Sequence, residues 1–294
     1  MKRGCWLVAV LVLGSLGCVG QVAAPSVSAA LAKTFAADVV YGEVGGTQLK
    51  LDVYRPADGS SGLRPAVIMI HGGGWTSYDK SSMGAMAKWL ARNGYVAFSI
   101  DYRLLKGSTN QWPVQLDDAQ RAVRWIRANA AAYGVDPKKI GAFGHSAGAQ
   151  MAALLGEVET RDNSDKALAE YSSKVQAVME MSGPTDFLTI TDVKSKGLLT
   201  QLMGGTETEK PEAWKVASPA LMVGKDTAPF LIMHGTKDDL VPMAQSEEFA
   251  AALEKAGVPV TLIKVDDGHS FATPEAIKRM AVESVAFFDK TLRQ

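Results

Sequence analysis

The sequence predicts an α/β protein built on a mainly parallel, doubly wound sheet. Short apolar runs rich in β-branched residues recur along the chain, as expected of strands that are buried on both faces. Runs with helical periodicity lie between them, and this alternation is typical of parallel strands joined by helical crossovers. The composition agrees with a large core, because 47% of the 294 residues are hydrophobic and 21% are charged.

The N-terminal edge of the sheet is predicted to be antiparallel. Residues 39–41 and 48–54 alternate apolar and polar side chains on either side of Gly45-Gly46, which is the pattern of a β-hairpin. A polar loop rich in glycine and serine follows over residues 55–64. We therefore expect the hairpin to add antiparallel strands at one edge of the parallel sheet.

The later elements alternate along the chain. Further strands are predicted at residues 66–70, 95–100, 139–143, 175–181, 230–233 and 260–265. Helices are predicted at residues 81–93, 114–132, 147–155, 244–256 and 274–292. A polar excursion spans about residues 183–216, and the sequence contains no internal repeat or interdomain linker. Residues 33–294 are therefore predicted to form a single domain.

Residues 1–32 are predicted to be a signal peptide. Lys2 and Arg3 precede an apolar stretch over residues 5–16 that is too short for a typical membrane-spanning helix. The sequence Ala30-Leu31-Ala32 has the small-x-small form of a cleavage site. We therefore expect an exported protein, periplasmic or secreted.

Lipidation is the alternative fate of this leader. The sequence Leu16-Gly17-Cys18 resembles a bacterial lipobox, which would attach the protein to a membrane through Cys18. Cys5 and Cys18 are the only cysteines, so cleavage at residue 32 would leave a chain without thiols or disulfides. A cysteine nucleophile is therefore not expected in the exported form.

Several function classes are disfavoured by composition and motifs. The formal net charge is zero and the basic residues form no long run, so nucleic-acid binding is not expected. The sequence has no H-E-x-x-H motif and no cysteine cluster, so no metal site is predicted. It has no G-x-G-x-x-G motif that opens a helix after the first strand, and we expect no nucleotide or other cofactor.

The pentapeptide Gly144-His145-Ser146-Ala147-Gly148 is the most informative motif. It lies between a predicted strand and a predicted helix, which is the setting of a nucleophile elbow. Such a turn lifts the serine hydroxyl clear of the backbone, and the flanking glycines let the strand and the helix approach closely. Ser146 is therefore the candidate nucleophile.

Two further positions complete a predicted catalytic triad. His269 follows the strand at residues 260–265, and it comes after the serine and a candidate acid in the order Ser, Asp, His. As general base it would take the proton of Ser146 and return it to the leaving group. The acid is expected after the preceding strand, where Asp238 and Asp239 are neighbours that spacing alone does not separate.

A glycine-rich loop supplies the predicted oxyanion hole. The sequence His71-Gly72-Gly73-Gly74-Trp75 follows the strand at residues 66–70. The backbone N–H groups of Gly73, Gly74 and Ala147 are expected to hold the oxyanion of a tetrahedral intermediate. The other histidines are predicted to brace or shape their own turns: His71, His145 and His234.

Together these motifs resemble the α/β-hydrolase fold, and within it the esterase and lipase group with an H-G-G-G oxyanion loop, in its hormone-sensitive-lipase-like or carbohydrate-esterase-like branch. The resemblance covers residues 39–294. In that group the acid lies four residues after the histidine of H-G-x-x-D-x-x-V-P, a motif that begins here at His234. The resemblance therefore implies Asp238 rather than Asp239 as the acid.

Two departures from the family pattern concern the substrate. The elbow has His145 where many hormone-sensitive-lipase-like members have aspartate, and G-H-S-A-G is similar to acetyl-xylan or feruloyl esterases and to kynurenine formamidases. No long N-terminal helical cap precedes the oxyanion loop, so we expect an open site covered at most by residues 183–216. Candidate substrate-binding residues are the aromatic side chains of Trp75, Trp112 and Phe271.

These observations predict an exported serine hydrolase that cleaves carboxylic esters through an acyl-enzyme, acting on small-molecule or carbohydrate esters. The first alternative is an amide hydrolase of the formamidase or peptidase type. The second is a non-catalytic binding protein on the same fold, although such proteins usually lack a member of the triad. Retention of Ser146, Asp238, His269 and the glycine loop favours the esterase.

Overall fold

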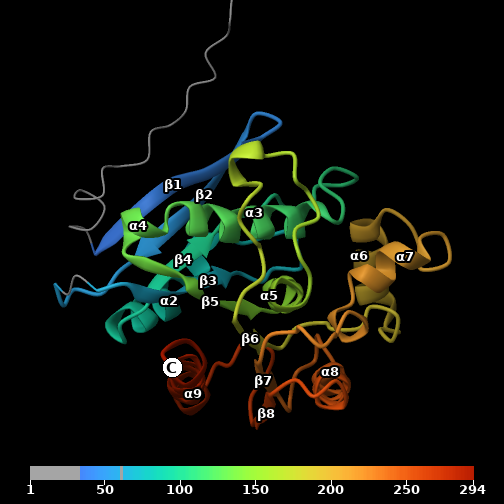
Figure 1. Ribbon diagram of the computed structural model, residues 1–294. Coiled ribbons are helices and arrows are strands. Elements are labelled where there is room, and N and C mark those ends of the chain that lie inside the picture. The colour runs from blue at the N-terminus through green and yellow to red at the C-terminus, as the bar shows by residue number, and fades with distance from the viewer. Residues whose placement is uncertain (1–33, 60–61) are drawn as a thin grey trace, which may run out of the picture.

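The computed structural model describes residues 34–59 and 62–294, so the predicted signal peptide and Cys18 lie outside the described residues. Within these ranges one sheet of eight strands forms the centre of the molecule, in the order β1-β2-β4-β3-β5-β6-β7-β8 (Figure 1). The pairs β1–β2 and β2–β4 are antiparallel, and every later pair is parallel. The predicted fold class is confirmed, including the antiparallel edge.

The element bounds follow the predicted alternation closely. The strands are β1 Phe35–Val44, β2 Thr47–Tyr54, β3 Arg64–Ile70, β4 Val96–Ile100, β5 Val135–His145, β6 Ala177–Met181, β7 Phe230–Gly235 and β8 Val260–Val265. The α-helices are α2 Gly84–Arg92, α3 Val114–Ala128, α4 Ala130–Tyr133, α5 Ala147–Glu157, α6 Val193–Met203, α7 Pro211–Val216, α8 Met243–Lys255 and α9 Pro274–Leu292. Short 3-10 turns are η1 Lys80–Met83, η2 Lys166–Leu168 and η3 Pro219–Leu221.

One predicted helix is divided in the structure. The helix expected at residues 114–132 is interrupted at Asn129, whose side-chain N–H donates to the carbonyl of Trp125 at 2.9 Å. Asparagine competes for backbone hydrogen bonds in this way, which makes it a poor residue inside a helix. The second piece, α4, ends where Gly134 adopts the left-handed conformation with φ 64°.

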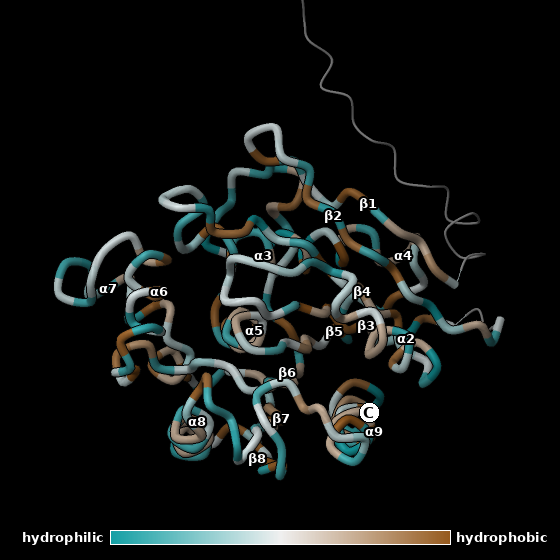
Figure 2. Tube along the Cα trace, turned by 180° about the vertical axis from the view of Figure 1, so that it is seen from behind, coloured by the Kyte–Doolittle hydropathy of each residue, from teal (hydrophilic) through white to brown (hydrophobic). Residues whose placement is uncertain are grey.

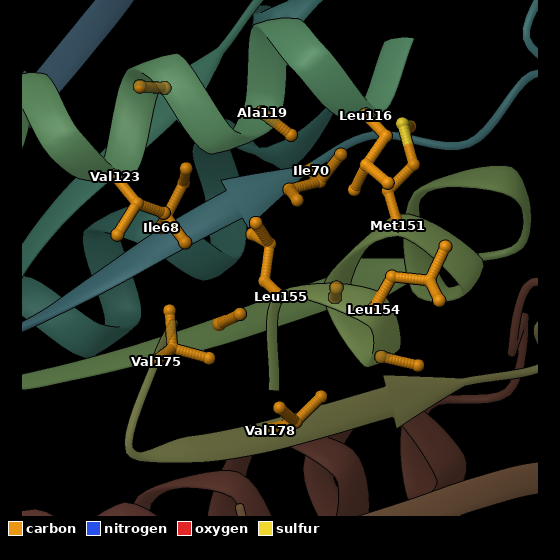
Figure 3. Packing of buried hydrophobic residues seen from close by; sticks show 14 of the residues in the cluster. Ile68, Ile70, Leu116, Ala119, Val123, Met151, Leu154, Leu155, Val175 and Val178 are labelled. Carbon is orange, nitrogen blue, oxygen red and sulfur yellow. The ribbon is translucent and has the colours of Figure 1, made fainter. Parts of the chain in front are cut away.

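The sheet has helices on both faces, and its strands alternate side chains between two cores. Ile68 and Ile70 of β3 pack with α3 and α5 in the larger core (Figure 3), while Val67 and Met69 pack with α2 and α9 on the opposite face. This is the pattern of a parallel sheet buried on both sides. Helices α8 and α9 carry both hydrophilic and hydrophobic residues (Figure 2), as expected where one helix face meets solvent.

The predicted excursion contains two helices, α6 and α7, which stand apart from the sheet beyond α5 (Figure 1). Trp214 of α7 is fully buried and packs edge-on against Phe187 at a ring-centroid distance of 6.3 Å. The excursion is therefore anchored to the main core rather than free of it. No helix in the described ranges has the length and apolarity needed to cross a membrane.

We expect Leu155→Ala to lower the free energy of unfolding by about 2–5 kcal/mol, because it leaves a cavity in the larger core. Leu155 is fully buried in the larger core, where its side chain points toward Ile68 and Ile70 (Figure 3). Urea denaturation of purified protein measures the change. The matched control is Leu240→Ala, at a side chain that is 56% exposed, and equal losses for both variants would contradict the assigned core.

Candidate active site

The nucleophile elbow is a strained turn between β5 and α5. Ser146 has φ 55° and ψ −122°, a conformation that non-glycine residues adopt rarely. Its backbone N–H donates to the carbonyl of Met181 in the neighbouring strand β6 at 2.8 Å. This bond ties the turn to the sheet and leaves the side chain free to point outward.

The glycines of the elbow are required by close contacts. A Cβ at Gly144 would lie 2.2 Å from the carbonyl oxygen of Gly148, and a Cβ at Gly148 would lie 2.1 Å from that of Ile70. No side chain fits at either position without moving backbone. The G-x-S-x-G pattern thus reflects how tightly α5 is drawn against β3 and β5.

Three side chains from different loops form one chain of hydrogen bonds. The hydroxyl of Ser146 lies 2.8 Å from Nε2 of His269, in the loop between β8 and α9. Nδ1 of His269 lies 2.7 Å from Oδ2 of Asp238, in the loop after β7. With Nδ1 donating to the carboxylate, Nε2 is left to accept the serine proton, which is the arrangement that nucleophilic catalysis requires.

The two neighbouring aspartates have different surroundings. The side chain of Asp238 is 0% exposed, and its Oδ1 accepts the backbone N–H groups of Leu240 and Val241, each at 2.9 Å. Asp239 is exposed and takes no part in this network. Asp238 is therefore the carboxylate that the fold brings to His269.

Burial alone would raise the pKa of Asp238, but its hydrogen bonds outweigh that effect. Side-chain bonds from His234 and His269, with the N–H groups of Val241 and Leu240, hold the pKa well below its usual range. The carboxylate therefore stays ionised at neutral and mildly acidic pH. An ionised carboxylate is what an imidazolium at His269 needs for stabilisation.

His234 is a second histidine in contact with Asp238. Its Nε2 donates to the carbonyl of Val241 at 2.9 Å and lies 3.1 Å from Oδ2 of Asp238. Its Nδ1 pairs with the hydroxyl of Ser246 in α8 at 2.7 Å. The prediction that this histidine shapes its turn agrees with these contacts, which also orient the acid.

Sequence reasoning missed Glu180, a fully buried carboxyl on β6 that lies under the same network. One of its oxygens accepts the N–H of Gly183, and the other has no hydrogen-bond partner among the described residues. Burial raises the pKa of Glu180 to about 7, opposed by His234 and the Gly183 bond and reinforced by the charge of Asp238. Glu180 lies within an apolar strand, and nothing in the sequence around it indicates a link to the triad, because only the packing of β6 and β7 brings it near His234.

The glycine loop after β3 is bent back on itself. Gly73 has φ 101°, and its carbonyl accepts the N–H groups of Thr76 and Ser77 at 3.0 and 3.1 Å. A Cβ at Gly73 would lie 2.3 Å from the carbonyl oxygen of Ser77, so the loop needs glycine there. Gly74 also has positive φ, at 57°.

The N–H groups of this loop and of the elbow remain available to a ligand. In the described part of the chain, neither Gly73 nor Gly74 donates its N–H to a backbone acceptor outside regular elements. Ala147 begins α5, and the first N–H groups of a helix have no carbonyl partner in their own helix. Gly73, Gly74 and Ala147 are the three donors that the sequence predicts to bind an oxyanion.

Two histidines brace these turns. His71 stacks on Tyr102 at a ring-centroid distance of 4.3 Å, and burial lowers its pKa. His145 donates from Nε2 to the carbonyl of His269 at 3.2 Å, which ties the elbow to the loop of the general base. Burial, reinforced by the nearby His269, lowers the pKa of His145 to about 4, so its ring is neutral near pH 7.

The three aromatic candidates for substrate contact lie in different places. Trp75 is 3% exposed, packs edge-on against Phe187 at 5.7 Å and donates to Gln150 at 3.4 Å. Trp112 is also buried in the larger core. Phe271 lines a cavity of about 580 Å³ beside the elbow, which neither tryptophan lines. No group of three or more metal-ligating side chains is found among the described residues.

Comparisons with known proteins agree with this fold. The sequence pattern of the BD-FAE family matches residues 51–253. Esterase LipQ of Mycobacterium tuberculosis is 33% identical over 260 residues, an alignment that covers 85% of this chain and 61% of that protein. The chain thus spans less than two thirds of the length of this curated relative.

Two solved structures resemble it over nearly their whole length. A thermophilic esterase of the planctomycete Thermogutta terrifontis, Est2 with propionate bound, is 28% identical with a TM-score of 0.76, covering 86% of this chain and 93% of that one. A truncated carbohydrate esterase from gut microbiota is 26% identical with a TM-score of 0.75, covering 89% and 97%. Identities above a quarter together with these scores indicate common descent as well as a common fold.

We expect Glu180→Gln to change how stability depends on pH. The folded pKa of about 7 lies above the ordinary value of 4.5, so the stability that protonated Glu180 contributes is lost as pH rises from 4.5 through 7. Glutamine does not ionise, and the variant should gain stability relative to the native chain over that interval. Urea unfolding at several pH values measures this. Glu247→Gln, at an exposed carboxyl paired with Lys264, is the control, and parallel pH profiles for the native chain and Glu180→Gln would contradict the assignment.

Proposed function

The chain belongs to the BD-FAE family of α/β-hydrolase esterases, and from this premise we propose that it is a serine hydrolase of carboxylic esters. The observation that carries the proposal is the unbroken hydrogen-bond chain from the Ser146 hydroxyl through His269 to Asp238, at 2.8 and 2.7 Å. Each member has the position and the hydrogen-bond partner that its role requires.

In the proposed reaction Ser146 Oγ attacks the ester carbonyl carbon while its proton passes to His269 Nε2. The bond from that carbon to the alcohol oxygen then breaks, and the alcohol leaves with the proton from His269. His269 next takes a proton from water, whose oxygen attacks the acyl carbon, and the proton returns to Ser146 as the acid leaves. Asp238 keeps Nδ1 of His269 protonated and stabilises the imidazolium.

The negative oxygen of each tetrahedral intermediate would be held by backbone N–H groups. We assign this role to Gly73, Gly74 and Ala147, on the support of the bent glycine loop and the helix N-terminus described above. Donors fixed in advance at a desolvated site stabilise the transition state more than water does. Phe271 is the proposed substrate contact among the aromatic candidates, because it lines the neighbouring cavity.

A short acyl group is supported by crowding on one side of the elbow. Trp75, which follows the loop glycines, is buried and packs against Phe187, and Leu198 of α6 lies 3.2 Å from where a Cβ at Gly74 would be. Related structures of Thermogutta terrifontis Est2 hold propionate and butyrate, which are short acids. A carbohydrate ester is the second candidate substrate, on the support of the similar gut-microbiota carbohydrate esterase.

We also propose export through a leader at residues 1–32, with membrane anchoring through Cys18 as the alternative. The basic start, the short apolar stretch and the small residues at 30 and 32 support cleavage. An exported enzyme would meet esters outside the cytoplasm, including acylated polymers.

We expect Ser146→Ala to lower kcat for methyl acetate by roughly 10⁴-fold or more while the unfolding transition is retained, because the triad acts as a unit.

Asp238→Asn should lower kcat for methyl acetate by about 10⁴-fold, since it leaves His269 in the wrong tautomer. Asp239→Asn is the matched control, and it should stay within about twofold of the native chain because this exposed carboxylate contacts none of the triad. Acid release followed by pH-stat measures the rates, and a larger loss in Asp239→Asn than in Asp238→Asn would transfer the acid role.

We expect the chain expressed in full in a bacterium to be recovered outside the cytoplasm with Lys33 as its first residue. Intact-mass measurement of the exported protein decides between the two fates of the leader. A mass that fits a lipid-modified N-terminus at Cys18 would contradict simple cleavage, and an intact leader on cytoplasmic protein would contradict export. Lys2→Glu/Arg3→Glu is the control that should retain the chain in the cytoplasm.

A further inference from the structure

An apolar groove runs along one face of the molecule, between α2 with its preceding turn η1 and the helix α9. It has a volume of about 580 Å³, within the range of roughly 300–1,000 Å³ typical of small-molecule sites. The indole N–H of Trp89 in α2 donates to the carbonyl of Ala281 in α9 at 3.0 Å, joining the two walls. Its lining is rich in methionine and aromatic side chains: Met83, Met86, Trp89, Met181, Phe271 and Met280.

The inner end of the groove adjoins the proposed triad. Gly72, His145 and Phe271 line it there, one residue from the oxyanion glycines, one from Ser146 and two from His269. The position of a Cβ on Gly72 is 3.1 Å from Cβ of Ser146, so this part of the groove wall lies against the elbow, while Ser146 and His269 themselves stand just outside the lining. A substrate held at Ser146 can therefore extend into this groove.

The position favours the alcohol portion of the substrate over the acyl portion. The alcohol oxygen must lie at Nε2 of His269, because it takes its proton there. The residues directly after His269, Ser270 and Phe271, form part of the groove wall. At the oxyanion loop, the buried ring of Trp75 packs against Phe187, and Leu198 of α6 lies 3.2 Å from where a Cβ on Gly74 would be, so we expect little room for a long acyl chain on that side.

The chemistry of the groove favours an apolar alcohol over a sugar. No aspartate, glutamate, lysine or arginine lines it in the described part of the chain, and its imidazole, on His145, is neutral near pH 7 and already bonded to a carbonyl. The side-chain hydroxyls in its lining are those of Tyr78, Ser82 and Ser270, and Ser82 already donates to the carbonyl of Asp79. A sugar seated there would find few partners for its own hydroxyl groups, which is unfavourable on desolvation. Methionine and aromatic side chains adapt well to aliphatic or aromatic groups.

We propose that the groove between α2 and α9 binds the leaving alcohol, and that the preferred substrates are short-chain esters of apolar alcohols. The inference rests on the proposed esterase function of Ser146. It assigns a specificity to that site. A longer acyl chain would be excluded near Gly74, and a longer alcohol chain would bind along α2 and α9 and raise kcat/KM.

The test uses pairs of isomeric esters that differ only in where the methylene groups lie. Hexyl acetate is compared with methyl heptanoate, and butyl acetate with methyl pentanoate, with methyl acetate as the common reference and acetylated xylose as the sugar ester. Each methylene buried from water favours binding by about fourfold. We expect kcat/KM for hexyl acetate to exceed that for methyl heptanoate and for methyl acetate by about tenfold or more.

A substitution at the edge of the groove tests whether the groove causes the preference for hexyl acetate. Ala85 is exposed on α2 and lines the groove, so Ala85→Trp should fill it and lower the ratio of kcat/KM for hexyl acetate over methyl acetate about tenfold. The matched control is Ala251→Trp on α8, at an exposed helical alanine that does not line the groove. It should leave the ratio unchanged.

The outcomes distinguish this inference from the function on which it rests. Serine-dependent hydrolysis that favours methyl heptanoate or acetylated xylose over hexyl acetate would overturn the alcohol assignment and leave the esterase function standing. An Ala85→Trp variant that keeps the preference of the native chain would overturn the same assignment. Hydrolysis of methyl acetate that survives Ser146→Ala would instead overturn the proposed function itself.

Discussion

The close approach of α5 to β3 and β5 is the constraint on which the site depends. Gly144 and Gly148 have no room for a side chain, and the N–H of Ser146 is bonded across the sheet to Met181. A serine held at φ 55° is strained, and the surrounding sheet must compensate for that strain. The compensation comes from the fully buried strands on either side of β5 and from a helix that is buried along its whole length.

The electrostatics below the elbow contrast two buried carboxyls. Asp238 is surrounded by donors, two N–H groups and two imidazoles, and its pKa is lowered. Glu180 has one backbone donor, and burial raises its pKa to about 7. Glu180 is the more deeply buried residue and has fewer donors, and both differences favour its protonated form over that of Asp238. His234 belongs to β7, contacts Asp238 and is close enough to Glu180 to affect its pKa. Because Asp238 in turn holds His269, the orientation of His269 depends on the sheet as well as on its own loop.

The two sides of the elbow differ in how far the hydrophobic core extends. On the side of α6 and α7, aromatic packing of Trp75, Phe187 and Trp214 continues the main core up to the oxyanion loop. On the side of α2 and α9, the core stops short and leaves a groove lined by methionines. His145 joins both regions, since its backbone belongs to the elbow and its ring bonds to the carbonyl of His269. Under the proposed function, the ends of the two hydrophobic cores would set which substrates fit.

The sequence by itself determined the sheet class, the order of its elements and the positions of Ser146 and His269, because each depends on local pattern or on motif spacing. Spacing left Asp238 and Asp239 open, the family resemblance implied Asp238, and the structure places Asp238 at 2.7 Å from His269. Hydrophobic periodicity marks strands and helices, and the elbow glycines mark a turn that few other residues permit. The break at Asn129 was not predictable from periodicity, because the apolar face continues across it. Only the tertiary structure separated the aromatic candidates: all three are buried, Trp75 and Trp112 in the larger core and Phe271 in the smaller one, but Phe271 alone of the three lines the cavity. It alone brought Glu180 under His234 and opened the groove between α2 and α9, since these features depend on contacts between segments far apart in the chain.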